Sequence, residues 1–298
     1  MTMYGVHAGL QHTTTDTLRD LWRKVEDFGF DWISIWDHFY AATGNDDAHC
    51  HEAVATHAAL ACTTTTVRCG SLVYCVGYRH PAVLANAICT IDHLSNGRAD
   101  LGLGAGWSEI EYRAYGFEFP AAKARLDMLE EAVACVSSLL RNDVSNFEGQ
   151  YFTLVDARCE PKPVQAKLPL WIGGGGEKRT LKIVAKYADG WNVPFVGPEA
   201  FAKKCEVIDE HCATVGRNPN DIRRTVNVGL AYNDASLVQQ FGALSEHVRP
   251  GVLTGSDEQI IDRIGQYVAA GADQVNLALR APFDVASVER FAGAMKLA

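Results

Sequence analysis

Short apolar segments recur along this chain of 298 residues, and the intervals between them leave room for a helix. Eight of these segments have the length and composition of buried strands: Tyr4–Ala8, Trp32–Trp36, Val67–Tyr74, Ala99–Leu103, Leu170–Gly173, Gly190–Val193, Thr225–Leu230 and Gln274–Leu279. Strand-like segments that alternate with helix-length intervals argue for parallel strands. Parallel neighbours must be joined by long crossovers, which are usually helices.

Segments with helical periodicity follow the apolar runs. The predicted helices are Asp16–Phe28, Ala53–Ala61, Pro81–Leu94, Ala122–Leu140, Glu177–Ala188, Pro198–Val215, Asp257–Ala270 and Asp284–Leu297. Pro81 suits the first turn of a helix, and Gly29 is suited to end one. Eight strand–helix units predict an α/β fold, a (β/α)₈ TIM barrel that forms a single domain over residues 1–298. In such a barrel the active site lies at the carboxyl ends of the strands.

Residues 142–168 interrupt the alternation and form an insertion between strands 4 and 5. The stretch Asn146–Phe152 is typical of a short hairpin around Gly149, and the prolines within Cys159–Pro163 favour extended backbone. Long irregular connections inside a compact domain tend to be functional. We therefore expect this insertion to lie near the mouth of the barrel and to cover it.

The overall composition excludes some partners. The formal net charge is −9 and no block is dense in lysine or arginine, which disfavours nucleic-acid binding. The first residues lack the order of a signal peptide, and no apolar run reaches the length of a membrane span. The nine cysteines are scattered without a spacing framework, so we expect reduced thiols and a cytoplasmic location.

A group of acidic and histidine residues at Asp46–Glu52, with His57 further on, is a weak candidate for a metal site. Its spacing matches no zinc pattern, and adjacent side chains rarely all face one ion. A solvated loop before a helix explains these residues better, so we predict no metal.

Four consecutive glycines follow the fifth predicted strand. Gly173, Gly174, Gly175 and Gly176 allow the backbone to curl close to a ligand, and the amides of a helix start then point at it. Glu177, Lys178 and Arg179 come next, and cations in a first turn oppose the helix dipole unless an anion is bound. This pattern favours a phosphate-binding site. The alternative is an ordinary glycine-rich turn with solvated basic residues.

Several landmarks occur in the order found in one known family. They are Asp31–His38, Gly77–Pro81, Asn96–Arg98, Leu101–Trp107, Glu109–Tyr112, the glycine run and Ala188–Asn192. With these motifs the chain resembles the luciferase-like monooxygenase superfamily of TIM barrels. The residues of the motifs are most similar to the branch that uses the deazaflavin coenzyme F420. The resemblance implies an F420-dependent oxidoreductase that transfers a hydride between the ring C5 and a small organic substrate.

The resemblance also implies roles for individual residues. His38 is the expected catalytic residue, with Asp37 positioning it, because both end the second strand; a structural hydrogen-bonding role is the alternative. A non-proline cis peptide is expected at Leu72–Val73, against the back of the ring. The expected walls of the cofactor site are small residues and one tryptophan: Gly104, Ala105, Gly106 and Trp107.

We predict that Trp107, Arg79, Trp191 and Arg280 contact the substrate. For Arg79 and Arg280 the alternative is a salt bridge within the protein. A glucose-phosphate dehydrogenase of the superfamily has a catalytic glutamate where this chain has Trp107, which argues against sugar-phosphate chemistry. Glu109 and Glu111 are nearby carboxylates, and at least one of them is expected to serve the helix dipole instead.

Two further hypotheses remain open from the sequence. One is a monooxygenase that uses reduced FMN and oxygen. The other is a non-catalytic barrel that carries or senses a flavin. Family members commonly form dimers, so a homodimer is also expected.

Overall fold

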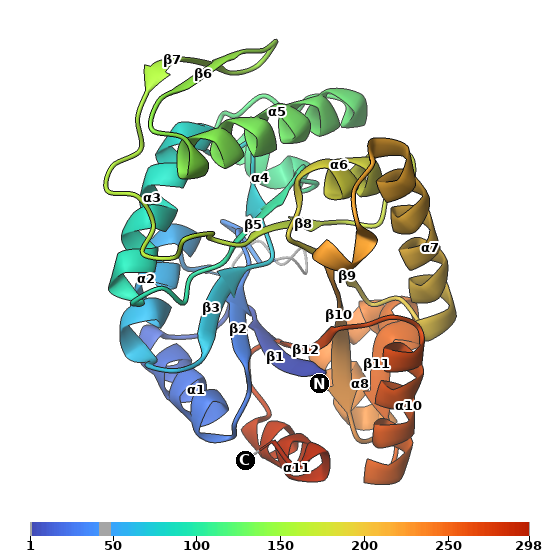
Figure 1. Cartoon of the computed structure of the whole chain (residues 1–298). Coiled ribbons are helices and arrows are strands. Elements are labelled where there is room, and N and C mark those ends of the chain that lie inside the picture. Colours follow the sequence, from blue (N-terminus) through green and yellow to red (C-terminus); the bar gives the residue numbers. More distant parts are fainter. Residues whose placement is uncertain (1, 42–48, 298) are drawn as a thin grey trace.

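The computed structural model describes residues 2–41 and 49–297 of the chain. Parallel strands form a central barrel, seen along its axis in Figure 1, and helices surround it. The barrel strands are β1 (Met3–Ala8), β2 (Trp32–Ile35), β3 (Arg68–Ser71), β4 (Tyr74–Cys75), β5 (Leu101–Gly104), β8 (Leu170–Gly173), β9 (Gly190–Pro194), β10 (Arg223–Ala231) and β12 (Gln274–Leu279). Their order is β3-β2-β1-β12-β10-β9-β8-β5-β4, so the first and last strands of the chain are neighbours.

The third strand of the barrel is divided into two pieces, β3 and β4. The Leu72–Val73 peptide between them is cis, as the resemblance implied. Below this interruption a parallel bridge joins Cys69 to Ala99, and above it β4 pairs with β5. The strand therefore meets β5, or the residue two positions before it, on both sides of the break and closes the ring. The predicted (β/α)₈ TIM barrel is confirmed.

The longer helices pack their apolar sides on the outer faces of the strands, and short helices lie in the connections. They are α1 (Thr15–Asp27), α2 (Ala53–Thr63), α3 (Pro81–Leu94), α4 (Glu109–Ala114), α5 (Ala122–Arg141), α6 (Thr180–Tyr187), α7 (Pro198–Val215), α8 (Asp234–Phe241), α9 (Ser245–Val248), α10 (Asp257–Ala269) and α11 (Val285–Met295). In α1 the side chain of Thr14 accepts a hydrogen bond from the amide of Thr17, and Leu18, Leu21 and Trp22 are buried. Among the described helices none has the length and apolar character needed to cross a membrane.

The predicted strands and long helices correspond to observed elements, and α3 and α7 have the predicted bounds. One predicted helix start is wrong: α6 begins at Thr180, so Lys178 lies in the preceding turn and Arg179 only caps the helix. Between β10 and α10 the structure adds elements that the sequence did not reveal: α8, α9, the strand β11 (Val252–Thr254) and three-residue 3₁₀ turns.

The insertion at residues 142–168 forms the predicted hairpin but does not cover the barrel mouth. Its strands, β6 (Ser145–Glu148) and β7 (Thr153–Ala157), stand outside the helix ring beyond α5 (Figure 1). Further along, Gln165 donates to Asp92 and to the carbonyl of Ala99, which precedes β5. Because α5 runs antiparallel to the strands, its carboxyl end lies at the amino ends of the strands, and the insertion starts there. The expectation of a lid is therefore corrected.

Glu26, in the last turn of α1, ties that helix to the loop before β3. One of its carboxylate oxygens accepts from the amides of Thr65, Thr66 and Val67 at 2.8, 2.6 and 3.0 Å. Burial raises the pKa of Glu26, but these hydrogen bonds lower it to about 2.

Glu26→Gln is expected to lower the free energy of unfolding by about 1–2 kcal/mol, because a neutral amide accepts these bonds more weakly than a carboxylate. Urea denaturation at neutral pH measures the change. Asp27→Asn, at the exposed neighbouring residue, is the matched control and should change stability by less than about 0.5 kcal/mol. Equal stability of the wild type and the Glu26 variant would contradict this role.

Candidate active site

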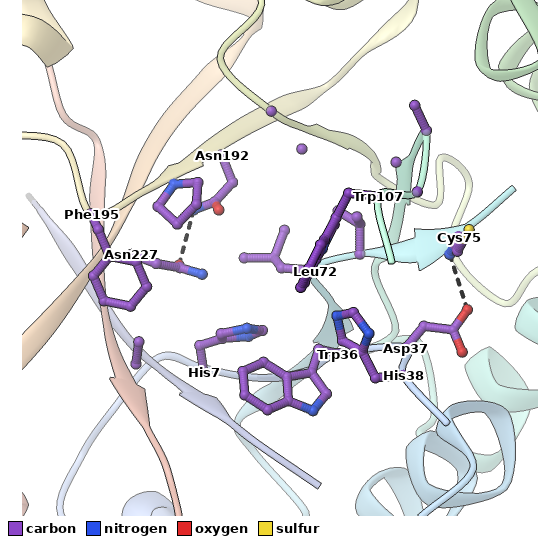
Figure 2. Close-up of a pocket in the computed structure, with 18 of the residues that line it drawn as sticks. His7, Trp36, Asp37, His38, Leu72, Cys75, Trp107, Asn192, Phe195 and Asn227 are labelled. Atoms are coloured by element: carbon purple, nitrogen blue, oxygen red, sulfur yellow. Dashed lines mark hydrogen bonds between the residues drawn. The ribbon is translucent and has the colours of Figure 1, made fainter. Parts of the chain in front are cut away.

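A cavity of about 410 Å³ opens at the carboxyl ends of the barrel strands. Its lining comes from eight regions of the barrel: His7; Trp36, Asp37 and His38; Leu72, Val73, Cys75 and Tyr78; Gly104–Trp107; Gly173, Gly174 and Thr180; Asn192, Pro194 and Phe195; Asn227; and Ala278–Arg280. Figure 2 shows many of these side chains around a common space. Parallel barrels place their chemistry at this end, so the cavity is the candidate active site.

His38 forms a hydrogen-bonded pair with Glu111 rather than with Asp37. Its Nδ1 lies 2.8 Å from a carboxylate oxygen of Glu111. The other oxygen of Glu111 accepts from the amides of Phe39 and Tyr40, and the Tyr78 hydroxyl donates to the first. Burial raises the pKa of Glu111, but the hydrogen bonds, foremost that of His38, lower it to about 2. Glu111 is therefore ionised, and His38 carries its hydrogen on Nδ1 and leaves Nε2 free for chemistry.

Asp37 serves a different partner, so its predicted role in positioning His38 is corrected. Its two oxygens accept a bidentate pair of bonds from Arg79, at 2.6 and 3.1 Å, and one of them also accepts from the amide of Cys75. The Nη2 atom of Arg79 also forms a salt bridge with the carboxylate of Glu52. The guanidinium of Arg79 is thus bound by two carboxylates, and Arg79 is not among the described residues that line the cavity. For Arg79 the geometry gives the salt bridge rather than the predicted substrate contact.

The residues predicted to form a ring-binding wall lie together in the cavity. Leu72, Val73, Gly104, Ala105 and Gly106 all line the cavity. The side chain of Val73 fills the space that glycines leave open on β5 and β8.

Trp107 continues this wall at the rim of the cavity. Its side chain is 63% exposed, and its ring lies 5.3 Å from that of His38, centroid to centroid. The predicted contact residue is therefore close to the histidine, with one side free to meet a ligand.

The glycine run begins in the cavity wall and leads away from it. Gly173 and Gly174 line the cavity, while Gly175 and Gly176 lie beyond them. Within the part of the chain that the structure describes, the backbone amides of residues 175–179 donate no hydrogen bond. Lys204 lies beside the run, with its Nζ 2.9 Å from the carbonyl of Gly175 and 3.1 Å from Glu177. The run is thus rich in free donors.

The basic residues after the run have other positions than expected. Arg179 donates to Asp127 at 2.6 Å and lies 3.8 Å from Glu130 on α5. Lys178 is exposed to solvent. No described contact brings either side chain to the cavity. Lys204 is the cation that the described residues place against the glycine run, and no pattern in the sequence pointed to it.

Of the two other predicted substrate-contacting residues, Arg280 lines the cavity and Trp191 does not. Trp191 is fully buried, stacks on Phe201 and donates to the carbonyl of Gly174, so it supports the glycine run from behind and does not reach the cavity. Arg280 does line the cavity, over the rings of Trp36 and Phe241. It forms no hydrogen bond or ion pair with any described residue, and its Nη1 is buried.

Other cavity residues were missed because they lie inside predicted strands: His7, Asn192 and Asn227. His7 accepts or donates a bond of 2.9 Å with Ser34, and burial, helped by Arg280 and His38, lowers its pKa to about 3. It is therefore neutral. Polar residues that alternate with apolar ones, as in the segment from Thr225 to Val228, were the available signal, because alternate residues of a barrel strand face inward.

The weak metal candidate lies partly outside the described residues, which omit Asp46 and Asp47. His49 and His51 both contact the carbonyl of Thr13, and His57 contacts the Tyr74 hydroxyl. Over residues 2–41 and 49–297 no group of three or more acidic, histidine or cysteine side chains is arranged to hold a metal ion.

A parallel barrel with a cavity at the carboxyl ends of its strands has the architecture of α/β-barrel enzymes. The sequence model of the luciferase-like monooxygenases matches residues 1–240, and the chain belongs to this family. The resemblance inferred from the sequence landmarks is confirmed.

Two relatives are named F420-dependent glucose-6-phosphate dehydrogenase. The protein from Amycolatopsis mediterranei is 32% identical over 217 residues, which are 70% of this chain and 63% of the relative. The protein from Microbacterium testaceum is 28% identical over 233 residues, 77% of this chain and 68% of that protein. The chain therefore spans 63% of the length of the first relative and 68% of the second.

Solved structures share the fold over nearly the whole chain. An F420-dependent secondary alcohol dehydrogenase, solved with an F420–acetone adduct, has a TM-score of 0.88 at 22% identity and covers 99% of this chain and 98% of its own. The F420-dependent tetrahydromethanopterin reductase from Methanopyrus kandleri has a TM-score of 0.81 at 18% identity, with coverage of 98% and 97%. At these identities the likeness concerns the fold.

Proposed function

We propose that this protein is an F420-dependent oxidoreductase that transfers a hydride between C5 of the deazaflavin and a small organic substrate. One observation carries the proposal: a single cavity joins the His38–Glu111 pair to the start of the glycine run. The names of the relatives and of the two structural neighbours support the choice of F420 over FMN.

The residues at the glycine run fit a phosphate. The amides of residues 175–179 are free of partners among the described residues, and Lys204 supplies a positive charge beside them. Gly174 has a φ of 123°, a conformation that suits glycine and turns the backbone away from the strand. We assign the phosphate of the cofactor to these amides, with Lys204 in place of the predicted Lys178 and Arg179.

The other end of the cavity fits a flat ring. Leu72, Val73 and Ala105 provide apolar surface, and Gly104 and Gly106 let a ring approach the backbone. When bound, F420 supplies a carbon that gives or accepts a hydride, which no side chain can do. The walls orient the ring and exclude water from the face that meets the substrate.

His38 then handles the proton that accompanies the hydride. Glu111 holds the hydrogen on Nδ1, so Nε2 is the atom that exchanges a proton with the substrate. With an alcohol as substrate, Nε2 accepts the hydroxyl proton as the carbon loses its hydride. In the reverse direction it returns a proton to the carbonyl oxygen.

Trp107 and Arg280 are the remaining candidates for substrate contacts. Trp107 lies beside His38 at the rim. Arg280 lines the same cavity, and its Nη1 has no hydrogen-bond partner among the described residues. We also propose that the enzyme works in the cytoplasm as a homodimer. The nine free cysteines support a reducing compartment, and the dimer follows from the family resemblance.

Separate titrations with F420 and FMN test the function. We expect a saturable spectral change with F420 and an affinity for FMN at least tenfold lower. Reduced cofactor on the protein should consume oxygen no faster than free reduced F420. Binding of FMN alone, followed by oxygen uptake, would instead establish the flavin monooxygenase. Tight binding without reoxidation by any of a panel of ketones, aldehydes and activated alkenes would establish the non-catalytic barrel.

A further inference from the structure

A ladder of buried amide side chains crosses the inside of the barrel and ends at the cavity. Asn192 on β9 donates to Asn227 on β10 at 3.0 Å, and Asn276 on β12 donates to the same oxygen at 3.0 Å. Gln274, two residues earlier on β12, donates to Asn276 at 2.7 Å. These four residues are at most 4% exposed. Of the four, Asn192 and Asn227 line the cavity, and Figure 2 shows them side by side at its edge.

A single hydroxyl fixes the direction of every bond in this ladder. An amide can turn by 180° and exchange its donor and acceptor ends, so a chain of amides alone has no preferred direction. The hydroxyl of Thr225 donates its only proton to the carbonyl of Trp191, at 3.0 Å. Toward Asn192, 2.9 Å away, it can therefore only accept, and the nitrogen of Asn192 must face it.

The rest of the ladder follows from this anchor. The nitrogen of Asn192 also faces Asn227, so Asn227 must offer its oxygen there. The side-chain oxygen of Asn227 can accept only from the side-chain nitrogen of Asn276. The side-chain oxygen of Asn276 then accepts from the side-chain nitrogen of Gln274. At the far end this direction leaves the Oε1 of Gln274 as the unused atom, and it is buried without a partner among the described residues.

At the cavity end, two side-chain amide atoms are left without a partner in the ladder, and its direction determines which is oxygen and which is nitrogen. The oxygen of Asn192 and the nitrogen of Asn227 make no hydrogen bond with a described residue. Unlike the oxygen of Gln274, neither is sealed away, because both side chains line the cavity. The cavity edge thus presents a fixed acceptor beside a fixed donor. A ligand that lacks the matching pair leaves a desolvated polar atom unsatisfied.

The position of this pair favours the cofactor as its partner. Asn192 pairs with Gly173 across strands β9 and β8. The backbone carbonyl of Asn192 accepts a hydrogen bond from the backbone amide of Gly174 at 3.0 Å. Val73, in the expected ring-binding wall, also packs against Gly173. The amide pair, the ring wall and the start of the glycine run therefore belong to one side of the cavity.

We propose that Asn192 and Asn227 bind the pyrimidinedione edge of the deazaflavin. The oxygen of Asn192 accepts from the ring N3–H, and the nitrogen of Asn227 donates to an adjacent ring carbonyl. The direction of this recognition is set by Thr225, which lies outside the cavity. The proposal rests on the proposed function, since it assigns an orientation to the same cofactor.

Binding of the chromophore without its phosphate tests the proposal apart from the glycine run. The probes are the deazaflavin with its ribityl chain and the same molecule methylated at N3, both followed by fluorescence titration. Wild-type protein should bind the methylated probe at least about tenfold more weakly, because the acceptor of Asn192 loses its donor. Equal affinity for the two probes would overturn the proposal.

Two substitutions examine the two halves of the argument. Asn227→Asp keeps the oxygen that accepts from Asn192 and Asn276 but turns the free donor into an acceptor, so the unmethylated probe should bind at least about tenfold more weakly. Thr225→Val removes only the anchor, and should weaken this probe about two- to fivefold while reducing the discrimination against N3-methylation. Asn86→Asp, at an exposed residue of α3, is the matched control and should bind both probes as the wild type does.

The outcomes separate this proposal from the function itself. If the wild type binds neither F420 nor the probes, the proposed function fails. If it binds F420 and both probes alike, and Asn227→Asp changes nothing, only the orientation fails and the amide pair faces another group, such as a substrate hydroxyl. The comparison of the two probes on the wild type needs no variant, so a folding defect in Asn227→Asp cannot leave the proposal unresolved.

Discussion

Replacing His38 with glutamine is expected to lower kcat about 100- to 1000-fold while leaving the affinity for F420 within about threefold. Glutamine keeps a donor toward Glu111 and roughly preserves the shape of the side chain, but it offers no group that can exchange a proton at the place of Nε2. Turnover under saturating substrate and a spectral titration of the cofactor measure the two effects separately.

His93→Gln is the matched control for this experiment. His93 also bonds through a ring nitrogen, to the carbonyl of Lys162, but it is exposed and distant from the cavity lining. Its variant should turn over as the wild type does. A His38 variant that retained full kcat would remove His38 from the mechanism, and one that lost F420 binding in proportion to activity would make it a cofactor-binding residue instead.

Replacing Glu111 with glutamine is expected to lower the free energy of unfolding by about 3 kcal/mol at pH 7. The lowering of the pKa of Glu111 from 4.5 to about 2 corresponds to this energy, and the carboxylate is nearly fully buried. A neutral amide has one acceptor atom for four donors and turns its own N–H₂ toward one of them. Urea denaturation of both proteins measures the loss.

The same experiment has a defined pH dependence. Because the pKa of Glu111 is lower in the folded than in the unfolded state, its contribution is complete above about pH 4.5 and is lost as the pH falls toward 2. The stability difference between the wild type and Glu111→Gln should therefore narrow between pH 7 and pH 3. Glu109→Gln, in the same short helix, is the control: among the described residues Glu109 pairs with Arg113 alone, at the surface, so its variant should lose less than about 0.5 kcal/mol.

A constant difference across this pH range would show that Glu111 stabilises the fold by its shape and not by its charge. A Glu109 variant as unstable as the Glu111 variant would show that the helix α4 as a whole, rather than one carboxylate, sets the effect.

The barrel was predictable because its strands are short apolar runs with helices between them. Residues such as Pro81 and Gly29 mark where the predicted helices begin and end. The segment between β10 and α10 was not recognised, since its helices are only one or two turns long and give too few residues for a periodic pattern.

The partner of His38 could not be found from the sequence. Glu111 is 73 residues away, and two glutamates at the start of a helix are ordinarily explained by the dipole. Asp37 is adjacent in the chain, but adjacent residues at a strand end point in different directions, and Asp37 meets Arg79 instead. Long-range pairs of this kind depend on how three loops meet above the barrel.

The lid expected from residues 142–168 failed for a topological reason. A connection that follows a crossover helix starts at the amino ends of the strands, whatever its composition, so an insertion there has to travel the height of the barrel to reach the mouth. The same rule explains why loops that follow strands, such as Gly104–Trp107 and the glycine run, do line the cavity.

Val73 limits which side chains the glycines around it can be replaced by. A Cβ on Gly173 would come within 2.7 Å of a Val73 methyl carbon, and one on Gly104 would meet the other methyl more closely still. Enlarging either glycine therefore demands a smaller residue at 73, so substitutions at these three positions have to be made together. Attempts to reshape the pocket by single mutations here should yield unstable proteins, whereas paired libraries can explore new ring-binding surfaces.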